Sequence, residues 1–355
     1  MSVDPEAVEA TASVAAAVTA ADPSASPRGH ERRRLARFVA RRVLTGILTL
    51  FVASILIFAA TDLLPGSPAS NALGKFATKP QIAALDRKLG YDHPLPVRYL
   101  NWLGGVVHGD LGDSAIGIAQ GSASAPIWPL IRDRLFNTLT LAITTAILLV
   151  PISLLLGAWA ALRVNRPADH AISTTTLALI ALPEFVVGTL LILLFFTVLH
   201  WLQPVSLIPP GSPAVAHPNL LVLPVLTLLA TSVAWTTRLV RAGMVEVLDS
   251  DFVQTARLQG LREPLVVRRY AMRNALAPSV QVFAVSIQAL FGGVIVTEVV
   301  FSYPGLGKEL VDAVLIHDTP LVQSIALLIA TFYILVNVVA DIVVVLLIPK
   351  LRTQV

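Results

Sequence analysis

Hydrophobic residues along this chain gather into long runs, and they do not follow the spacing of an amphipathic helix or strand. A helix needs about 20 mostly apolar residues to cross a hydrocarbon core of about 30 Å. About six runs are long enough, and they cover residues 43–64, 138–162, 171–199, 220–240, 277–300 and 321–348. The pattern predicts an all-α integral membrane protein with about six transmembrane helices.

The segments around these runs predict four parts. Residues 1–27 lack the basic start of a signal peptide and are predicted to be a disordered cytoplasmic extension. Residues 28–64 join a basic segment to the first span, and the polar, turn-rich residues 65–134 predict a small extracytoplasmic insert. Residues 135–355 form the remaining transmembrane core, including a charged loop at 249–275.

Lysine and arginine positions predict the orientation. Basic residues cluster at 28–42, 163–166, 238–273 and 350–352, whereas residues 201–219 contain none and 301–320 contain only Lys308. Because cytoplasmic loops carry the excess of positive charge, both termini and the charged loop are predicted to be cytoplasmic. Residues 28–42 are also compatible with a contact to anionic membrane lipid.

Overall composition excludes several other classes. A net charge of +4 gives no support for nucleic-acid binding, and the absence of cysteine excludes disulfides and thiolate metal sites. The seven histidines are scattered without a metal-ligand spacing, so no metal site or catalytic site is predicted. The acids in residues 109–114 do not have the spacing of a calcium loop, which favours a structural turn there.

Most of the charged loop lies within residues 251–278, which read DFVQTARLQGLREPLVVRRYAMRNALAP. Ser250 or Asp249 can cap a short helix, Gly260 ends it, and Pro264 can begin a second helix. Phe252, Ala256 and Gln259 would share a face of the first helix. The pattern predicts a helix–glycine–helix elbow that is presented to a partner.

This loop resembles the EAA loop of ABC-importer permeases of the dipeptide/oligopeptide/nickel type, with Arg262 and Tyr270 as departures from the common pattern. The resemblance extends from about residue 37 to about residue 352, and it includes the Pro304-Gly305-Leu306-Gly307 segment, expected to be a loop. It implies the type I ABC-importer permease architecture in a bacterial plasma (inner) membrane. It also implies import of peptides or a related solute; nickel chelates and small glycans stay open.

The resemblance further implies partners and coupling residues. The partners are a homologous second permease, two ABC ATPase subunits and an extracytoplasmic solute-binding protein. The residues implied to couple to the ATPase are Asp251, Phe252, Thr255, Ala256, Arg257, Gly260, Arg273 and Asn274. Small Ala256 would permit close approach, and Arg257 would pair with an acidic rim of the partner.

ATP and Mg are expected on the partner subunits, with no cofactor bound by this chain. Gly305–Lys308 lacks the preceding glycine and the following Ser/Thr of a phosphate-binding loop. The chain is therefore expected to be a transporter subunit and not an enzyme.

Polar residues inside the predicted spans are candidates for function. Glu184, Gln281, Gln288 and Glu298 are predicted to line a translocation pathway, with Glu298 reaching toward the outer interface and contacts between helices as the alternative role. Pro183, Asn337 and Asp341 are assigned to helix packing. A different function stays open, an ion- or proton-coupled carrier that uses Glu184, Glu298 and Asp341.

Overall fold

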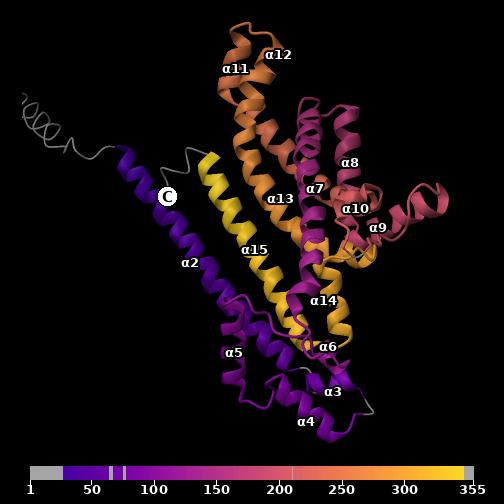
Figure 1. The fold of residues 1–355 in the computed structure, drawn as a ribbon. Helices are drawn as coiled ribbons and strands as arrows, with labels where there is room; N and C mark the ends of the chain where they lie inside the picture. Colours follow the sequence, from indigo (N-terminus) through magenta and orange to yellow (C-terminus); the bar gives the residue numbers. More distant parts are fainter. Residues whose placement is uncertain (1–26, 64–66, 75–76, 210, 348–355) are drawn as a thin grey trace, which may run out of the picture.

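The computed structural model describes residues 27–63, 67–74, 77–209 and 211–347. The extension before residue 27 and the residues after 347 lie outside these ranges. Within them the chain folds into helices and turns, with a single isolated β-bridge between Asp113 and Pro126. Figure 1 shows long helices in the middle, the charged loop at one end and the insert at the other. The end of the molecule with the charged loop is called the elbow end, and the opposite end is called the insert end.

Five helices are long and apolar enough to cross a membrane. They are α2 (Pro27–Asp62), α7 (Ile127–Ala161), α10 (Pro218–Leu248), α13 (Met272–Val300) and α15 (Thr319–Leu347). Each corresponds to a predicted span, so the hydropathy pattern located these five correctly.

The predicted span at 171–199 is not one continuous helix. It is a pair of helices, α8 (Pro167–Ala181) and α9 (Glu184–Ile192), bent by 105°. Leu182 is extended because it precedes Pro183, whose ring disfavours the helical conformation of its predecessor. After α9 the π-helical turn η1 (Leu193–Val198) continues the second arm. The pair makes a sixth span only if both arms are counted together.

Helix α10 is the centre of the larger bundle, packing against α7, α8, α9 and α13. Its apolar core includes Leu149 from α7, Leu228 from α10 and Val294 from α13. Helices α2 and α15 pair with each other beside this bundle, as Figure 1 also shows. Only 11% of the α2 span window and 6% of the α15 window are buried in the isolated chain, against 61% of the α10 window.

The insert contains four short helices, α3 (Pro68–Leu73), α4 (Lys79–Lys88), α5 (Leu95–Val107) and α6 (Ala115–Ala119). Tyr99 and Trp102 of α5 pack on Phe58 near the end of α2, with ring centroids 5.4 and 5.7 Å away. The run at 109–114 is a turn in which the Asp110 carboxylate accepts the Gly112 N–H. No cluster of metal-ligating side chains occurs among the described residues.

Two boundaries near the insert differ from the prediction. Helix α7 begins at Ile127, before the apolar run at 138, because Ile127, Ile131 and Leu135 are buried against α14 (Leu306–Leu315) and α15. The segment between the last two spans, which was expected to be a loop, contains the helix α14. A short 3₁₀ turn, η2 (Ala214–Ala216), precedes α10.

Candidate functional site

The elbow has the predicted helix–glycine–helix form. Helix α11 (Asp251–Leu258) ends before Gly260, which has φ +77°, a value that a residue with a side chain rarely adopts. Pro264 lies in the first turn of α12 (Glu263–Leu265), and the chain continues as helix through η3 (Val266–Ala271) into α13. Ser250 is the N-cap residue, but its hydroxyl donates to Val247 O and does not cap α11. The second arm of the elbow is thus continuous with a membrane span.

The inner face of α11 is packed within this chain. Val253 and Ala256 are buried in a cluster with Met244 and Leu248 of α10 and Val266 of η3. Only 4% of Ala256 is exposed in this chain, and close approach of a partner at Ala256 stays a prediction. Its small side chain lets α11 lie against its own bundle.

Arg257 also has a partner inside the chain. Its guanidinium donates to the Glu263 carboxylate across the elbow, at 2.8 and 3.2 Å. This hydrogen-bonded pair lowers the pKa of Glu263 and raises that of Arg257. Within this chain the pair joins the two arms of the elbow, and the pairing of Arg257 with a partner's acidic rim stays a prediction.

The outer face of α11 is exposed. Phe252 is 45% exposed and Leu258 is 89% exposed, beside the exposed Asp251 and Thr255. Leu258 was missed in the sequence, although an apolar residue outside the Val253–Ala256 stripe was a usable signal. Asn274 lies beyond this face, and its amide donates to Tyr270 O at 2.6 Å. Arg273 lies in the first turn of α13, but its side chain lies outside the described part of the structure.

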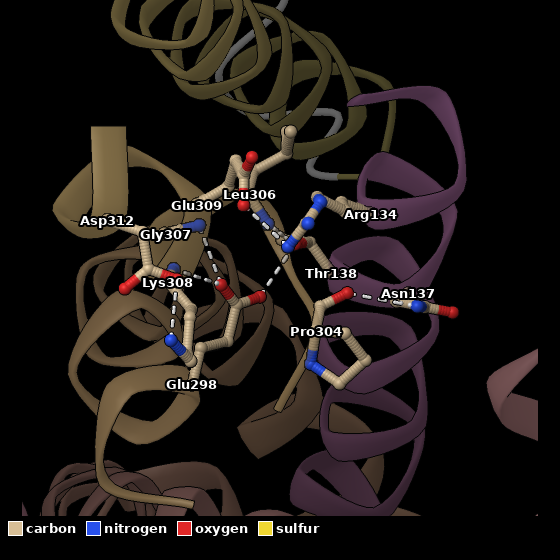
Figure 2. Close-up of polar contacts among 10 residues, drawn as sticks. All are labelled: Arg134, Asn137, Thr138, Glu298, Pro304, Leu306, Gly307, Lys308, Glu309 and Asp312. Carbon is tan, nitrogen blue, oxygen red and sulfur yellow. Dashed lines mark hydrogen bonds and ion pairs between the residues drawn. The ribbon is translucent and has the colours of Figure 1, made fainter. Parts of the chain in front are cut away.

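At the insert end Glu298 holds α14 against α7 and α13 (Figure 2). Its carboxylate accepts from Thr138 Oγ1 at 2.6 Å, from Gly307 N at 2.7 Å and from Lys308 N at 3.2 Å. Thr138 Oγ1 in turn accepts from Leu306 N at 2.8 Å. These five residues, Thr138, Glu298, Leu306, Gly307 and Lys308, are called the Glu298 network. The expectation that Glu298 reaches the interface is wrong, because its exposure is 0%.

Glycine is required around this carboxylate. A Cβ on Gly305 would lie 2.0 Å from Glu298 Oε1, and one on Gly307 would lie 2.7 Å from Ile295 Cα. Nearby, Asn137 donates to Pro304 O at 3.0 Å, and Arg134 pairs with Glu309 at 2.6 Å. The proline-glycine segment is therefore a close-packed seat for a buried carboxylate.

Glu184 is the other carboxylate near this part of α13. It begins α9 and accepts a hydrogen bond from Thr297 Oγ1 at 2.8 Å. Gly293 leaves it space, since a Cβ there would lie 2.4 Å from Glu184 Oε2. Glu184 therefore contacts Thr297, the residue next to Glu298 in the sequence. Gln281 is exposed and Gln288 is half-buried, nearer the elbow end of α13.

Comparison with known proteins identifies the class of this chain. The family model of binding-protein-dependent transport system inner membrane components matches residues 153–353, and the model of the N-terminal part of such membrane components matches residues 35–142. The chain belongs to this family. It is an ABC-importer permease with the type I permease fold, a multi-pass membrane protein and not itself an enzyme.

Similar permeases have assigned names. One is the probable peptide ABC transporter permease protein y4tP of Sinorhizobium fredii, 33% identical over 304 residues that cover 85% of this chain and 94% of that protein. Another is the glutathione transport system permease protein GsiC of Escherichia coli strain K12, 36% identical over 304 residues, covering 86% and 95%. The family places this permease in a transporter complex with other subunits.

Ion pairs also join α2 to α15 and α8 to α10. Asp341 of α15 meets Arg42 of α2 at 3.0 Å, with the half-buried Asn337 one turn earlier on α15. The pair between α10 and α8 was not predicted. In it, Arg241 of α10 donates twice to Asp169 of α8, at 2.6 and 2.7 Å. An arginine at the end of an apolar run was a signal for such a pair.

Proposed function

We propose that this permease imports a peptide or a glutathione-like solute, using ATP hydrolysis on separate ATPase subunits that dock on the elbow. The observation that carries this proposal is the exposed face of α11. Leu258 and Phe252 project into solvent while the inner face of the same helix is fully packed. A rigid helix that exposes large apolar side chains is typical of a docking surface.

The partners in this proposal are two ABC ATPases that carry ATP and Mg, a homologous second permease and an extracytoplasmic solute-binding protein. The elbow end is assigned to the cytoplasm, together with both termini. Arg163, Arg166, Arg268 and Arg269 lie at or near this end, in keeping with the excess of positive charge in cytoplasmic loops. The solute class is suggested by the names of y4tP and GsiC.

Motion of the elbow can reach the spans by two routes. The buried cluster around Val253 and Ala256 connects α11 to the ends of α7 and α10. The second arm continues directly into α13. A partner that rotates the elbow would therefore tilt these helices and expose a central path alternately to each side. Glu184, Gln281 and Gln288 are assigned to that path.

Uptake into proteoliposomes tests the proposal. The complex, purified through a tag on this chain, is reconstituted with its binding protein and given labelled peptide or glutathione. Uptake should require ATP inside and should disappear with an ATPase subunit that cannot hydrolyse ATP. Uptake driven by a proton gradient without any ATPase subunit would instead identify an ion-coupled carrier.

A further inference from the structure

The buried contacts of helix α8 are polar. Within the described residues, none of its side chains joins an apolar cluster of buried residues. Its two buried residues, Asp169 and Thr176, are both polar. The Thr176 hydroxyl donates to Ser173 O of the same helix at 3.0 Å. Asp169 is therefore the buried side chain through which α8 bonds to other elements.

The Asp169 carboxylate joins three parts of the chain. Its two oxygens accept from the Arg241 guanidinium of α10, from Nε at 2.6 Å and from Nη2 at 2.7 Å. One oxygen also accepts from the backbone N–H of Asn165 at 3.0 Å, in the turn between α7 and α8. The Ser173 hydroxyl, one turn further along α8, donates to the other oxygen at 3.3 Å. The carboxylate thus connects α10, this turn and the start of α8.

The form of the ion pair fixes the position of α8 against α10. Two parallel hydrogen bonds between a guanidinium and a carboxylate set both distance and direction, whereas apolar contacts have no direction. The Asp169 side chain is 4% exposed and that of Arg241 is 28% exposed. The side chains of the pair Arg42–Asp341, between α2 and α15, are more open, at 46% and 31%. Because removal from water offsets much of the attraction, a buried pair adds little net stability, and its fixed geometry is the property to explain.

Arg241 lies on the part of α10 that leads to the elbow. Met244 and Leu248 follow it about one and two turns later, on the same side of the helix. Both pack with Val253 and Ala256 of α11 in the apolar cluster of the elbow. A rotation of the elbow that turns the end of α10 would therefore move the Arg241 guanidinium.

Asp169 lies at the start of the broken span. Helix α8 begins near the elbow end and leads through the 105° bend to α9 (Figure 1). Glu184 at the start of α9 accepts from Thr297 of α13 at 2.8 Å. A displacement of α8 would therefore reach Glu184, which is assigned to the central path.

We infer that the Arg241–Asp169 ion pair is a coupling contact that transmits motion of the elbow from α10 to α8 and α9. Arg241 and Asp169 are then positioning residues of the transport cycle. The pair adds a third route to the two that run through the buried cluster and through α13. The inference rests on the proposed function, because the ATPase subunits on the elbow drive the motion.

Coupling is measured as solute imported per ATP hydrolysed. The complete complex is reconstituted in proteoliposomes with its binding protein, and uptake of labelled glutathione and labelled dialanine is recorded beside ATP hydrolysis. Asp169→Asn removes the negative charge of the pair, and Arg241→Lys keeps the positive charge but cannot make two parallel bonds. Retention of the ATPase subunits is checked for every variant.

Two variants serve as matched controls. Ser173→Ala removes a hydrogen bond to the same carboxylate but leaves the contact with α10 in place. Asp341→Asn makes the same chemical change as Asp169→Asn, in the ion pair between α2 and α15. Neither control breaks the connection between α8 and α10, so both should import as much solute per ATP as the wild type.

Asp169→Asn should keep its ATPase subunits and hydrolyse ATP while importing at least about threefold less solute per ATP. Arg241→Lys should lower this ratio in the same direction. A wild-type ratio in Asp169→Asn, or an equal fall in either control, overturns the inference. So does a joint fall of hydrolysis and uptake at an unchanged ratio, which would assign the pair to structure alone.

Assembly and wild-type activity decide how these results apply. If the complex with Asp169→Asn does not assemble, Arg241→Lys decides by the same ratio. A wild-type complex without ATP-driven uptake would overturn the proposed function and this inference with it. Wild-type uptake with equal ratios in all variants overturns the inference alone.

Discussion

Different interactions stabilise the two ends of this permease. At the elbow end, Val253 and Ala256 pack into an apolar cluster, and the ion pair between the arms, Arg257–Glu263, is exposed. At the insert end, buried Glu298 accepts hydrogen bonds from two elements. Apolar contacts have no direction and tolerate small rotations, whereas buried charge-assisted hydrogen bonds fix geometry. The difference indicates an elbow that can move as a unit and an insert end that holds its shape.

The largest effect is expected when Glu298 is removed. Glu298→Ala leaves the Gly307 and Lys308 N–H groups and the Thr138 hydroxyl without their acceptor, at about 1–3 kcal/mol for each buried group. We expect a loss of at least about 3 kcal/mol, measured by thermal unfolding of the purified permease. Glu298→Gln should lose less because it keeps one acceptor, and Glu246→Ala on the exposed side of α10 is the control. Equal melting temperatures for Glu298→Ala and the control would show that the network contributes nothing.

A smaller effect is expected from crowding the same network. Gly307→Ala puts a methyl group 2.7 Å from the Ile295 backbone, and such overpacking costs about 1–3 kcal/mol. Gly292→Ala on α13 is a matched control, because a methyl group there meets nothing within 4 Å. Unfolding midpoints of the two variants should separate clearly. If they coincide, the close packing of this segment is not what holds α14.

At the elbow, the turn should be sensitive to backbone conformation. Gly260→Ala forces a side chain into a left-handed conformation, at about 1–2 kcal/mol. Gly260→Asn should cost less, since asparagine tolerates this conformation better. Hydrogen exchange in α11 should rise in the order Gly, Asn, Ala. An unchanged exchange pattern would contradict the assigned role of Gly260.

The smallest effect on stability is expected from the elbow's ion pair. Arg257→Gln should cost about 0.2–1 kcal/mol, because both side chains are well exposed. Arg257 lowers the pKa of Glu263 in the folded state, so the pair stabilises above the ordinary glutamate pKa and loses this contribution as pH falls through the lowered value. The stability difference between wild type and variant should therefore shrink as pH falls below the ordinary glutamate pKa of about 4.3, and vanish once pH is below the lowered pKa of Glu263. A difference that persists in that acidic range would mean that Arg257 acts by packing and not by charge.

Hydropathy predicted the five long spans because each needs only local apolar length, and Gly260 and Pro264 predicted the elbow because they restrict their own backbone. What failed depends on residues far away in sequence. The burial of Glu298 depends on Thr138, 160 positions away, and the ion pair of Asp169 depends on Arg241, 72 positions away. The burial of Ala256 was not predicted because a short helix does not reveal which stripe its own bundle will cover. Pro183 was a signal for the bend between α8 and α9, but not for its angle of 105°.

The most direct test of the account is whether the exposed face of α11 holds the ATPase subunits. Leu258→Asp changes a side chain that is 89% exposed, so the fold should be unaffected. Leu315→Asp makes the same change at a 70% exposed leucine at the other end of the molecule. We measure co-purifying ATPase and ATP-driven uptake for both variants. The account predicts that Leu258→Asp loses ATPase subunits and uptake while Leu315→Asp keeps its ATPase; normal retention and uptake with Leu258→Asp would contradict it.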